Sequence, residues 1–393
     1  MKKPLDTLLV AVGGYGDTYA GYLLSGEFDA THRLVGVVDP YAAEAPHYAA
    51  LKARVPIYDT MAQFYAQHSA DMAVISSPIQ FHYDQCLTAF RHGTHVLCEK
   101  PLVPTLAQLD QLEAAQGNLT FGVAFQWCHS RTMLSLKERI LAGEFGRATR
   151  LKSFVSWPRD WSYYNRGIKW AGNILSPEGT LVYDSVASNA TAHYIQNMLY
   201  LLGPSMEESA PLSNVSAECY RANRIQSFDT IAFKGTAAGA EVHYCATHPV
   251  NYTINPLIDF QFEKARIWLN VIDQKHEFTL HHQDGRIESL GFGLENGLKN
   301  RLHFMAQHIN GQSNPNAPLC TTRTVRPFTS LVQALFQEAT FHAFPPSMVV
   351  EDTENEMTYV PGLHLDLWDA FQQNKLPHQA GFAWAQPADT LSL

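Results

Sequence analysis

The sequence predicts an α/β protein: an N-terminal Rossmann domain with a doubly wound parallel sheet, followed by a C-terminal α+β domain with a large open, mostly antiparallel sheet. Three observations predict this fold class. Apolar runs alternate with helical segments up to about residue 125. A glycine-rich turn follows the first run. Beyond Phe125 the strand-like runs alternate polar and apolar residues between Gly, Asn and Asp turns.

The N-terminal part repeats a strand–helix unit. Its runs are apolar on both faces, which is typical of parallel strands covered by helices. Strands that alternate with helices imply right-handed crossovers and a doubly wound sheet. We expect strands at Leu8–Val12, Arg33–Pro40, Met72–Pro78, His95–Pro101 and Thr120–Phe125, and helices at Thr18–Leu24, Phe81–Gly93 and Thr105–Ala115.

The turn after the first strand has the pattern of a dinucleotide-binding loop. Ala11, Gly13 and Gly16 occupy the three glycine positions, with alanine replacing the first glycine. Gly13 lets the backbone approach a pyrophosphate, and Gly16 lets the helix lie close to the strand. Gly14 and Tyr15 complete the loop. A plain tight turn between strand and helix has the same pattern.

Asp39 makes the dinucleotide interpretation more specific. It ends the second strand, 23 residues after Gly16, where a carboxylate accepts hydrogen bonds from the adenosine ribose hydroxyls. The same charge repels a 2′-phosphate, and Pro40-Tyr41-Ala42 supplies no arginine to offset it. The expected cofactor is therefore NAD rather than NADP. A turn-initiating Asp-Pro is the alternative role for Asp39.

Three further segments resemble the glucose–fructose oxidoreductase / inositol dehydrogenase / MocA (Gfo/Idh/MocA) family. Residues 76–101 read SSPIQFHYDQCLTAFRHGTHVLCEKP, residues 138–154 read ERILAGEFGRATRLKSF, and residues 193–203 read HYIQNMLYLLG. The resemblance covers roughly the first 205 residues well and the remainder only in general layout. It implies that Ser76, Ser77, Pro78, His82, Glu99 and Lys100 belong to the cofactor site, and we add Gln126, which follows the last strand.

Lys100 also has a physical interpretation of its own. It lies at the carboxyl end of a predicted parallel strand, where open α/β sheets bind ligands. Beside a cationic nicotinamide in a partly dry pocket its pKa is pushed down. Lys100 is then able to donate to the reacting oxygen. Pro101 shapes the turn, and Glu99 orients Lys100 or contacts the nicotinamide ribose. The alternative is an ordinary surface lysine.

The sequence predicts two domains. Residues 1–127 are expected to bind NAD, and residues 128–393 are expected to bind substrate and to form the oligomer. Strands are expected at Val215–Ala222, Phe228–Gly235, Ala240–His248, Ile258–Val271 and His276–Gln283. Family members use the exposed face of this sheet to dimerise or tetramerise. The resemblance therefore implies a homo-oligomer.

The resemblance also implies an acid–base histidine at the start of a helix, four residues after an aspartate. Counting back ten residues from Gly203 identifies His193, but Asn189 stands where the aspartate is expected. We expect Asn189 to share a helical face with His193. Asn189 cannot supply the charge that stabilises a protonated imidazole, and Asp184 is the candidate replacement. A structural helix histidine is the alternative for His193.

Residues 157–172 read WPRDWSYYNRGIKWAG, in which aromatic rings alternate with cations. Rings stack on the C–H face of a sugar, and Arg and Lys bind hydroxyls or a carboxylate. We expect a substrate-binding loop without regular structure, and its packing on the sheet or a partner subunit is the alternative. The candidate residues are Trp157, Arg159, Trp161, Tyr163, Tyr164, Arg166, Lys169 and Trp170.

Composition excludes several other classes. The 46% hydrophobic and 17% charged residues exclude a disordered chain. The net charge of −9 and the lack of basic blocks argue against nucleic-acid binding. No membrane span, secretory signal or metal-type cysteine spacing is visible, so we expect a cytoplasmic enzyme without a metal. The prediction is an NAD-dependent oxidoreductase of a carbohydrate or cyclic polyol. The alternatives are a redox-neutral NAD-dependent glycosidase and a non-catalytic NAD-binding regulator.

Overall fold

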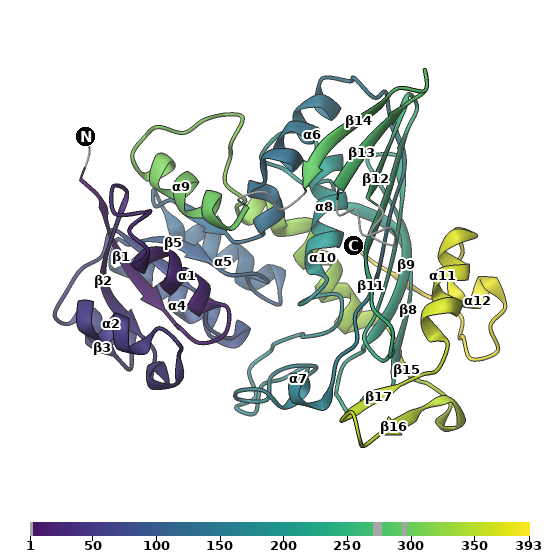
Figure 1. Cartoon of the computed structure of the whole chain (residues 1–393), viewed down its shortest axis with the longest axis horizontal. Helices are drawn as coiled ribbons and strands as arrows, with labels where there is room; N and C mark the ends of the chain where they lie inside the picture. Colours follow the sequence, from purple (N-terminus) through teal and green to yellow (C-terminus); the bar gives the residue numbers. More distant parts are fainter. Residues whose placement is uncertain (1–2, 270–276, 293–296) are drawn as a thin grey trace. The chain divides into compact units, whose positions relative to one another are not determined.

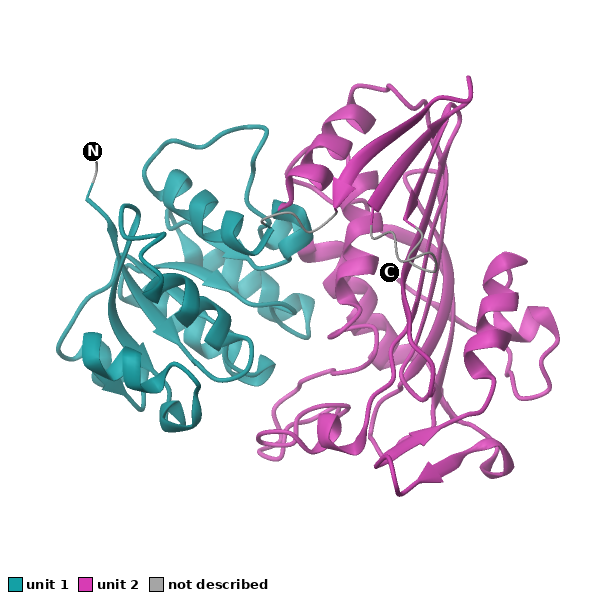
Figure 2. Ribbon diagram, viewed as in Figure 1, with its two compact units in different colours: residues 1–129, 296–324 teal, residues 130–295, 325–393 magenta. Residues whose placement is uncertain are grey.

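The computed structural model describes residues 3–269, 277–292 and 297–393. Two compact units make up the chain (Figure 2). The first unit comprises residues 1–129 and 296–324, and the second comprises residues 130–295 and 325–393. The main border lies two residues beyond the one expected from the sequence. Residues 296–324, which the sequence analysis placed with the C-terminal part, belong to the first unit.

The first unit contains a six-stranded parallel sheet in the order β3-β2-β1-β4-β5-β6, which confirms the doubly wound fold. The short edge strand β3 was not expected. The strands are β1 (Leu5–Val10), β2 (His32–Val38), β3 (Ile57–Tyr58), β4 (Met72–Ile75), β5 (His95–Cys98) and β6 (Phe121–Val123). The helices are α1 (Gly16–Leu24), η1 (Ala42–Glu44), α2 (Tyr48–Arg54), α3 (Met61–Tyr65), α4 (Ile79–Arg91), α5 (Leu106–Gln116), η2 (Gln126–His129) and α9 (Gly297–Ile309).

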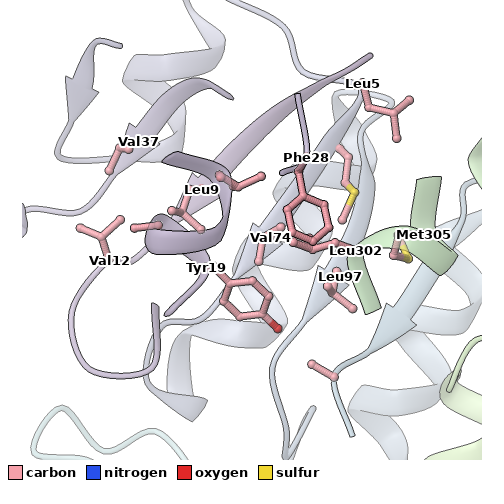
Figure 3. Packing of buried hydrophobic residues seen from close by; sticks show 14 of the residues in the cluster. Leu5, Leu9, Val12, Tyr19, Phe28, Val37, Val74, Leu97, Leu302 and Met305 are labelled. Atoms are coloured by element: carbon pink, nitrogen blue, oxygen red, sulfur yellow. The ribbon is translucent and has the colours of Figure 1, made fainter. Parts of the chain in front are cut away.

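Helix α9 belongs to the first unit because its apolar face completes that unit's core. Leu302 and Met305 are fully buried in the same cluster as Val74 and Leu97 of the sheet (Figure 3). A Cβ added at Gly122 of β6 would lie 2.9 Å from the Met305 sulfur, so β6 and α9 pack closely. Burial of such side chains is the main driving force of folding. It anchors a helix that is distant in sequence from the rest of the unit.

The second unit is built on a ten-stranded sheet in the order β14-β13-β12-β11-β7-β10-β9-β8-β15, with β18 also paired to β8. Only the β10–β7 and β15–β8 pairs are parallel, so the sheet is mixed and mostly antiparallel as predicted. Its strands are β7 (Ala148–Ser156), β8 (Leu212–Arg221), β9 (Thr230–Ala237), β10 (Ala240–Thr247), β11 (Ile254–Phe262), β12 (Ala265–Leu269), β13 (Glu277–His282), β14 (Ile287–Phe292), β15 (Phe341–Ala343) and β18 (Asp389–Leu391). A separate hairpin pairs β16 (Val350–Asp352) with β17 (Met357–Tyr359).

Helices lie on both sides of this sheet (Figure 1). Helix α8 packs against β7 from one side, and α11 contacts β7 and β10 from the other. Phe154 of β7 packs on Trp368 and Phe371 of α11, with ring centroids 5.4 Å apart in each pair. The helices are α6 (Arg131–Leu141), α7 (Trp161–Asn165), α8 (Ala192–Leu202), α10 (Thr322–Glu338, which begins at the end of the first unit), η3 (Pro346–Met348), α11 (Leu363–Gln372) and α12 (Pro377–Ala380).

One strand expectation is wrong. The described part of the run Ile258–Val271, residues 258–269, lies in two antiparallel strands, β11 and β12, with Ile258 opposite Leu269. The polar pair Glu263-Lys264 makes the turn between them, and its backbone N–H groups bond to Arg147 and Phe145. Residues 270, 271 and 276 of the expected strands lie outside the described residues. Within the described part of the chain, no helix has the length and apolar character needed to span a bilayer.

Candidate cofactor site and acid–base residues

The glycine-rich loop joins β1 to α1. A Cβ at Gly16 would lie 2.3 Å from the Ala11 carbonyl oxygen and 2.7 Å from Ser76 Oγ, so only glycine permits this approach. By contrast, a Cβ at Gly13 would meet no atom within 4 Å, which leaves the loop backbone open to a ligand. Ala11 adopts φ 63°, a left-handed conformation that glycine usually provides. This loop fits the pyrophosphate of a dinucleotide at a helix N-terminus.

Asp39 follows β2 and contacts the glycine-rich loop directly. Its Oδ2 accepts a hydrogen bond from the Val12 N–H at 2.8 Å. Its Oδ1 accepts one from the Tyr41 N–H at 2.8 Å, so Asp39 also has the turn role considered for an Asp-Pro. A carboxylate has about four acceptor positions, and these two bonds leave capacity for ribose hydroxyls. Asp39 therefore fits a ribose-binding role while it holds the loop.

The segment after β4 connects the glycine-rich loop with the Glu-Lys-Pro turn. Ser76 Oγ donates to the Ala11 carbonyl at 2.8 Å, and Pro78 precedes α4. His82 is buried; its Nε2 faces the Ser77 carbonyl at 2.8 Å and its Nδ1 faces the Pro101 carbonyl at 3.0 Å. Burial lowers the pKa of His82. Its contacts are with the backbone, so it positions the turn that follows Lys100.

Glu99 and Lys100 lie immediately after β5, at the carboxyl edge of the parallel sheet as predicted. Glu99 is buried, and its Oε2 accepts from the Lys100 backbone N–H at 3.1 Å. Glu99 thus orients the Lys100 backbone, one of its two expected roles. Its Oε1 accepts from the Tyr19 hydroxyl at 2.8 Å and from Arg301 Nη1 at 2.6 Å.

Tyr15 and Gln126 meet at the same edge. The Tyr15 hydroxyl donates to Gln126 Oε1 at 2.9 Å, which joins the glycine-rich loop to η2. The Tyr15 side chain is 43% exposed. The structure thus brings together residues that the sequence suggested for the cofactor site: the glycine-rich loop, Asp39, Ser76, Glu99, Lys100 and Gln126 follow the carboxyl ends of β1, β2, β4, β5 and β6. Their contact with NAD stays a prediction.

His193 is the second residue of α8, as expected for the start of a helix. The expectation that Asn189 shares a helical face with it is wrong, because α8 begins at Ala192 and Asn189 lies in the preceding turn. The Asn189 N–H bonds to the Ser185 carbonyl at 3.2 Å within that turn. Asn189 Nδ2 instead donates to the Tyr163 hydroxyl oxygen at 3.4 Å. Asn189 therefore connects the turn before α8 to the aromatic segment.

Asp184 is buried at 2% exposure, and it holds the end of the aromatic segment. Its Oδ2 accepts from the Gly172 N–H at 2.5 Å, and its backbone N–H donates to the Asn173 carbonyl at 3.0 Å. Burial and then the negative charge of Asp184 raise the pKa of Tyr163, which keeps that phenol protonated. That Asp184 replaces the carboxylate missing at position 189 and stabilises a protonated His193 stays a prediction.

The segment 157–172 is not wholly irregular, contrary to expectation. Asp160 caps a short helix, α7, by accepting from the Tyr163 N–H at 2.9 Å. An aspartate three residues before Tyr163 is the local signal for this cap. The Arg166 guanidinium lies 4.0 Å from the Tyr163 ring centroid and 5.0 Å from that of Trp170. The Arg159 guanidinium lies 4.8 Å from the same Tyr163 ring centroid.

The members of this segment divide into packed and exposed residues. The Trp157 indole donates to Asn255 Oδ1 of β11 at 3.1 Å, which agrees with the alternative of packing on the sheet. The Trp161 indole donates to Thr358 Oγ1 of β17 at 2.9 Å. Arg166 and Lys169 are exposed and present cations to solvent. Trp161 and Tyr164 also line a pocket with Asn223 and Thr358. Packing is thus shown for Trp157 and Trp161, and substrate binding by the other residues of the segment stays a prediction.

A comparison with protein-family models identifies the first unit. Residues 6–122 match the model GFO_IDH_MocA, described as an oxidoreductase family with an NAD-binding Rossmann fold. Residues 6–122 belong to the Gfo/Idh/MocA oxidoreductase family. The resemblance inferred from the Glu-Lys-Pro segment is thereby confirmed, and so is the expected cofactor, NAD.

Relatives and solved structures agree with the Gfo/Idh/MocA assignment. The chain is 24% identical over 232 residues to D-xylose 1-dehydrogenase (NADP(+)) from Hypocrea jecorina, covering 54% of this chain and 57% of that one. It is 30% identical over 122 residues to inositol 2-dehydrogenase from Streptomyces avermitilis, covering 30% and 36%. The matches thus span only about half or less of these curated relatives.

Two solved structures share the fold of this chain over most of its length. The WlbA dehydrogenase from Bordetella pertussis, in complex with NADH and UDP-GlcNAcA, has a TM-score of 0.67 at 22% identity, covering 85% of this chain and 96% of that one. A super-repressor mutant of Gal80p from Saccharomyces cerevisiae has a TM-score of 0.67 at 15% identity, covering 85% and 95%. At these identities the likeness shows the fold.

Sequence reasoning missed two residues of the Gfo/Idh/MocA unit that contact the Glu-Lys-Pro turn, Tyr19 and Arg301. Tyr19 lies one turn into α1, so its spacing from the glycine-rich loop was a usable signal. Arg301 lies 202 residues after Glu99 in the chain. No local pattern joins residues so far apart.

Proposed function

We propose that the protein is an NAD-dependent dehydrogenase that oxidises a secondary alcohol of a sugar or cyclic polyol. One observation carries the proposal: Lys100 stands at the carboxyl end of β5 in an NAD-binding unit, with its backbone held by the buried Glu99 carboxylate. Ligands of open α/β sheets bind at this edge. A lysine there is placed to act on a substrate beside the cofactor.

Several residues of the first unit are suited to hold NAD. The open backbone at Gly13 and Gly14 offers N–H groups to the pyrophosphate. Asp39 has acceptor capacity left for the adenosine ribose. When bound, NAD supplies the acceptor for a hydride. The carboxylate of Asp39 disfavours a 2′-phosphate, although one relative is named for NADP(+).

In the proposed reaction the substrate hydroxyl loses its proton to the His193 imidazole while the carbinol carbon loses a hydride. The products are a ketone, reduced cofactor and one proton, which His193 passes to solvent. The Lys100 ammonium donates a hydrogen bond to the substrate oxygen as negative charge develops there. In this proposal His193 accepts the hydroxyl proton, and Lys100 stabilises the negative charge on the substrate oxygen.

The aromatic segment supports a polyhydroxylated substrate. Arg166 and Lys169 are exposed cations, and Arg166 lies over the Tyr163 and Trp170 rings. Guanidinium groups bind hydroxyls and carboxylates through several donors, and rings stack on apolar C–H faces. The relatives named as xylose and inositol dehydrogenases support the same substrate class.

Two alternatives follow from particular observations. Asn189 in place of an aspartate favours a redox-neutral glycosidase, because an enzyme that returns the hydride in each cycle exports no net proton at that step. The shared fold of Gal80p, whose solved form is called a super-repressor mutant, favours an NAD-binding regulator. The presence of both Lys100 and His193 argues against a regulator.

A single set of incubations separates the three functions. The enzyme is incubated with NAD and a panel of monosaccharides, cyclic polyols and aryl glycosides, and NADH absorbance and aglycone release are followed together. Net NADH from a free sugar or polyol supports the dehydrogenase. Aglycone release without NADH, with deuterium incorporation from D2O beside the transient ketone, supports the glycosidase. NAD binding with neither product supports the regulator.

The location and assembly of the protein belong to this proposal. All six cysteines are buried free thiols, which suits a reducing compartment such as the cytoplasm. We expect a homo-oligomer that uses the sheet of the second unit. Because α11 covers that sheet at β7 and β10, the part expected to be available to a second copy lies toward β11–β14.

A further inference from the structure

A buried arginine lies at the centre of the cofactor edge of the first unit. Arg301 of α9 is 1% exposed. Its Nη1 donates to Glu99 Oε1 at 2.6 Å and to the Ala124 carbonyl at 3.0 Å. Its Nη2 donates to the Tyr15 hydroxyl oxygen at 3.4 Å, and its Nε to the Leu298 carbonyl at 3.4 Å. All three guanidinium nitrogens therefore have acceptors.

Apart from Leu298 of α9 itself, these acceptors belong to three separate segments of the candidate cofactor site. Tyr15 is part of the glycine-rich loop, and Glu99 receives the Lys100 backbone N–H. Ala124 directly follows β6. The Tyr15 hydroxyl also donates to Gln126. Arg301 thus donates hydrogen bonds to the glycine-rich loop, to the Glu-Lys-Pro turn and to the residue that follows β6.

The chemistry of the site requires an arginine. A guanidinium presents five N–H donors in a rigid plane, whereas a lysine presents its donors from one point. The guanidinium also lies 4.9 Å from the Tyr19 ring centroid. Burial and the neighbouring Glu99 carboxylate raise the pKa of Tyr19, so the phenol stays a donor to Glu99. The only opposite charge paired with Arg301 in the described ion pairs is Glu99.

We propose that Arg301 is a positioning residue for NAD binding, which holds Tyr15 of the glycine-rich loop and the Glu99–Lys100 turn in their ligand-ready arrangement through one guanidinium. Holding these groups before NAD arrives lowers the ordering cost of binding. Helix α9 therefore contributes to the cofactor site as well as to the core. The inference rests on the NAD-binding unit and is independent of which reaction the protein catalyses.

The test measures NAD binding by calorimetry without substrate, together with the urea midpoint of unfolding. Arg301→Met should weaken NAD binding at least about tenfold, by analogy with the loss that follows removal of a hydrogen-bond partner behind a metal ligand. Arg301→Lys keeps the positive charge but loses the planar set of guanidinium donors, so it should also weaken NAD binding. The matched control is Lys299→Met on the same helix, which removes an ion pair to Glu27 near the surface and should leave NAD affinity unchanged.

A double variant separates positioning from simple charge compensation. Arg301→Met leaves the Glu99 carboxylate buried without its cation, which is destabilising. Arg301→Met with Glu99→Gln removes that charge and should regain unfolding midpoint relative to Arg301→Met, while NAD affinity stays reduced relative to Glu99→Gln alone. Recovery of affinity to the Glu99→Gln level would show a purely structural arginine and overturn the proposal. Wild-type NAD affinity in Arg301→Lys would overturn it as well, even where Arg301→Met fails to fold.

Discussion

Asn189 Nδ2 donates a hydrogen bond to the Tyr163 hydroxyl oxygen at 3.4 Å, and this contact joins the turn before α8 to the aromatic segment. Tyr163 is in turn covered by Arg166 and Arg159. An aspartate at position 189 could also bond to Tyr163, because the phenol hydroxyl can donate to a carboxylate. This makes position 189 the most informative one for the type of chemistry.

We predict that Asn189→Asp raises NADH-producing turnover. The added carboxylate lies near the start of α8 and is expected to stabilise the protonated form of His193, as a paired negative charge does. Asn189→Ala is the control, because it removes the amide without adding charge and should not raise turnover. If Asn189→Asp lowers NADH formation while a glycoside is still cleaved, the glycosidase becomes the better proposal.

Asp39 is expected to decide the cofactor preference. The wild type should bind NAD+ at least about tenfold more tightly than NADP+, which corresponds to about 1.4 kcal/mol. Asp39→Asn keeps a side-chain acceptor for the Val12 N–H but removes the negative charge. The difference in affinity between NAD+ and NADP+ should therefore narrow, mainly because NADP+ binds more tightly. Calorimetry with both cofactors measures the gap.

Asp39→Ala provides the comparison. It should also weaken NAD+ binding, because the loop loses the bond from Val12 and the ribose loses its acceptor. Equal or tighter binding of NADP+ than of NAD+ by the wild type would contradict the assignment of Asp39.

Lys100 and His193 are predicted to carry the chemistry. Replacing either by alanine should lower turnover at least about a hundredfold, the lower range for losing a general acid or base. NAD affinity should change little in His193→Ala, because His193 belongs to the second unit. Steady-state rates and calorimetry on the same preparations test both statements. Near-normal turnover of His193→Ala would move the base to Asp184 or a tyrosine of the aromatic segment.

Arg166 is predicted to bind substrate. Arg166→Met should raise KM about tenfold, the loss expected for one hydrogen bond to a charged donor, with kcat little changed. The control is Arg147→Met, another exposed arginine of the same unit, which pairs with Glu263. A normal KM in Arg166→Met would assign the segment to packing.

The protein is predicted to lose stability in mild acid through buried histidines. Burial, and then the charge of Lys152, lower the pKa of His243 to about 3 from 6.5. The folded state therefore binds this proton more weakly than the unfolded state. The contribution of His243 is fully present above about pH 6.5 and is lost as pH falls from there toward 3.

Urea unfolding as a function of pH tests the histidine effect. His243→Gln should reduce the dependence of the unfolding free energy on pH by up to about 1.4 kcal/mol per pH unit below the unfolded-state pKa. His378→Gln, at an exposed position of the same unit, is the control and should change the slope much less. An unchanged slope in His243→Gln would show that other groups govern acid lability.

Local pattern in the sequence was enough to predict the parallel sheet of the first unit and most of the candidate cofactor residues at its edge. Alternating apolar runs and helical segments predicted the parallel sheet, because strands buried on both faces must be apolar throughout. The strand ends then carried Asp39, Ser76 and Lys100 to one edge, since the carboxyl ends of parallel strands meet there. Glycine spacing predicted the loop for the steric reason seen at Gly16.

Only the tertiary structure decided the features that depend on contacts between distant segments. The burial of Leu302 and Met305 brings α9 back to the first unit, and Arg301 then reaches Glu99 across 202 residues. Asn189 lies in a turn outside α8 because its amide and backbone bond to Tyr163 and Ser185, and spacing along the chain does not show this. Periodicity and turn residues encode local conformation, whereas the free energy of packing side chains selects which distant segments meet.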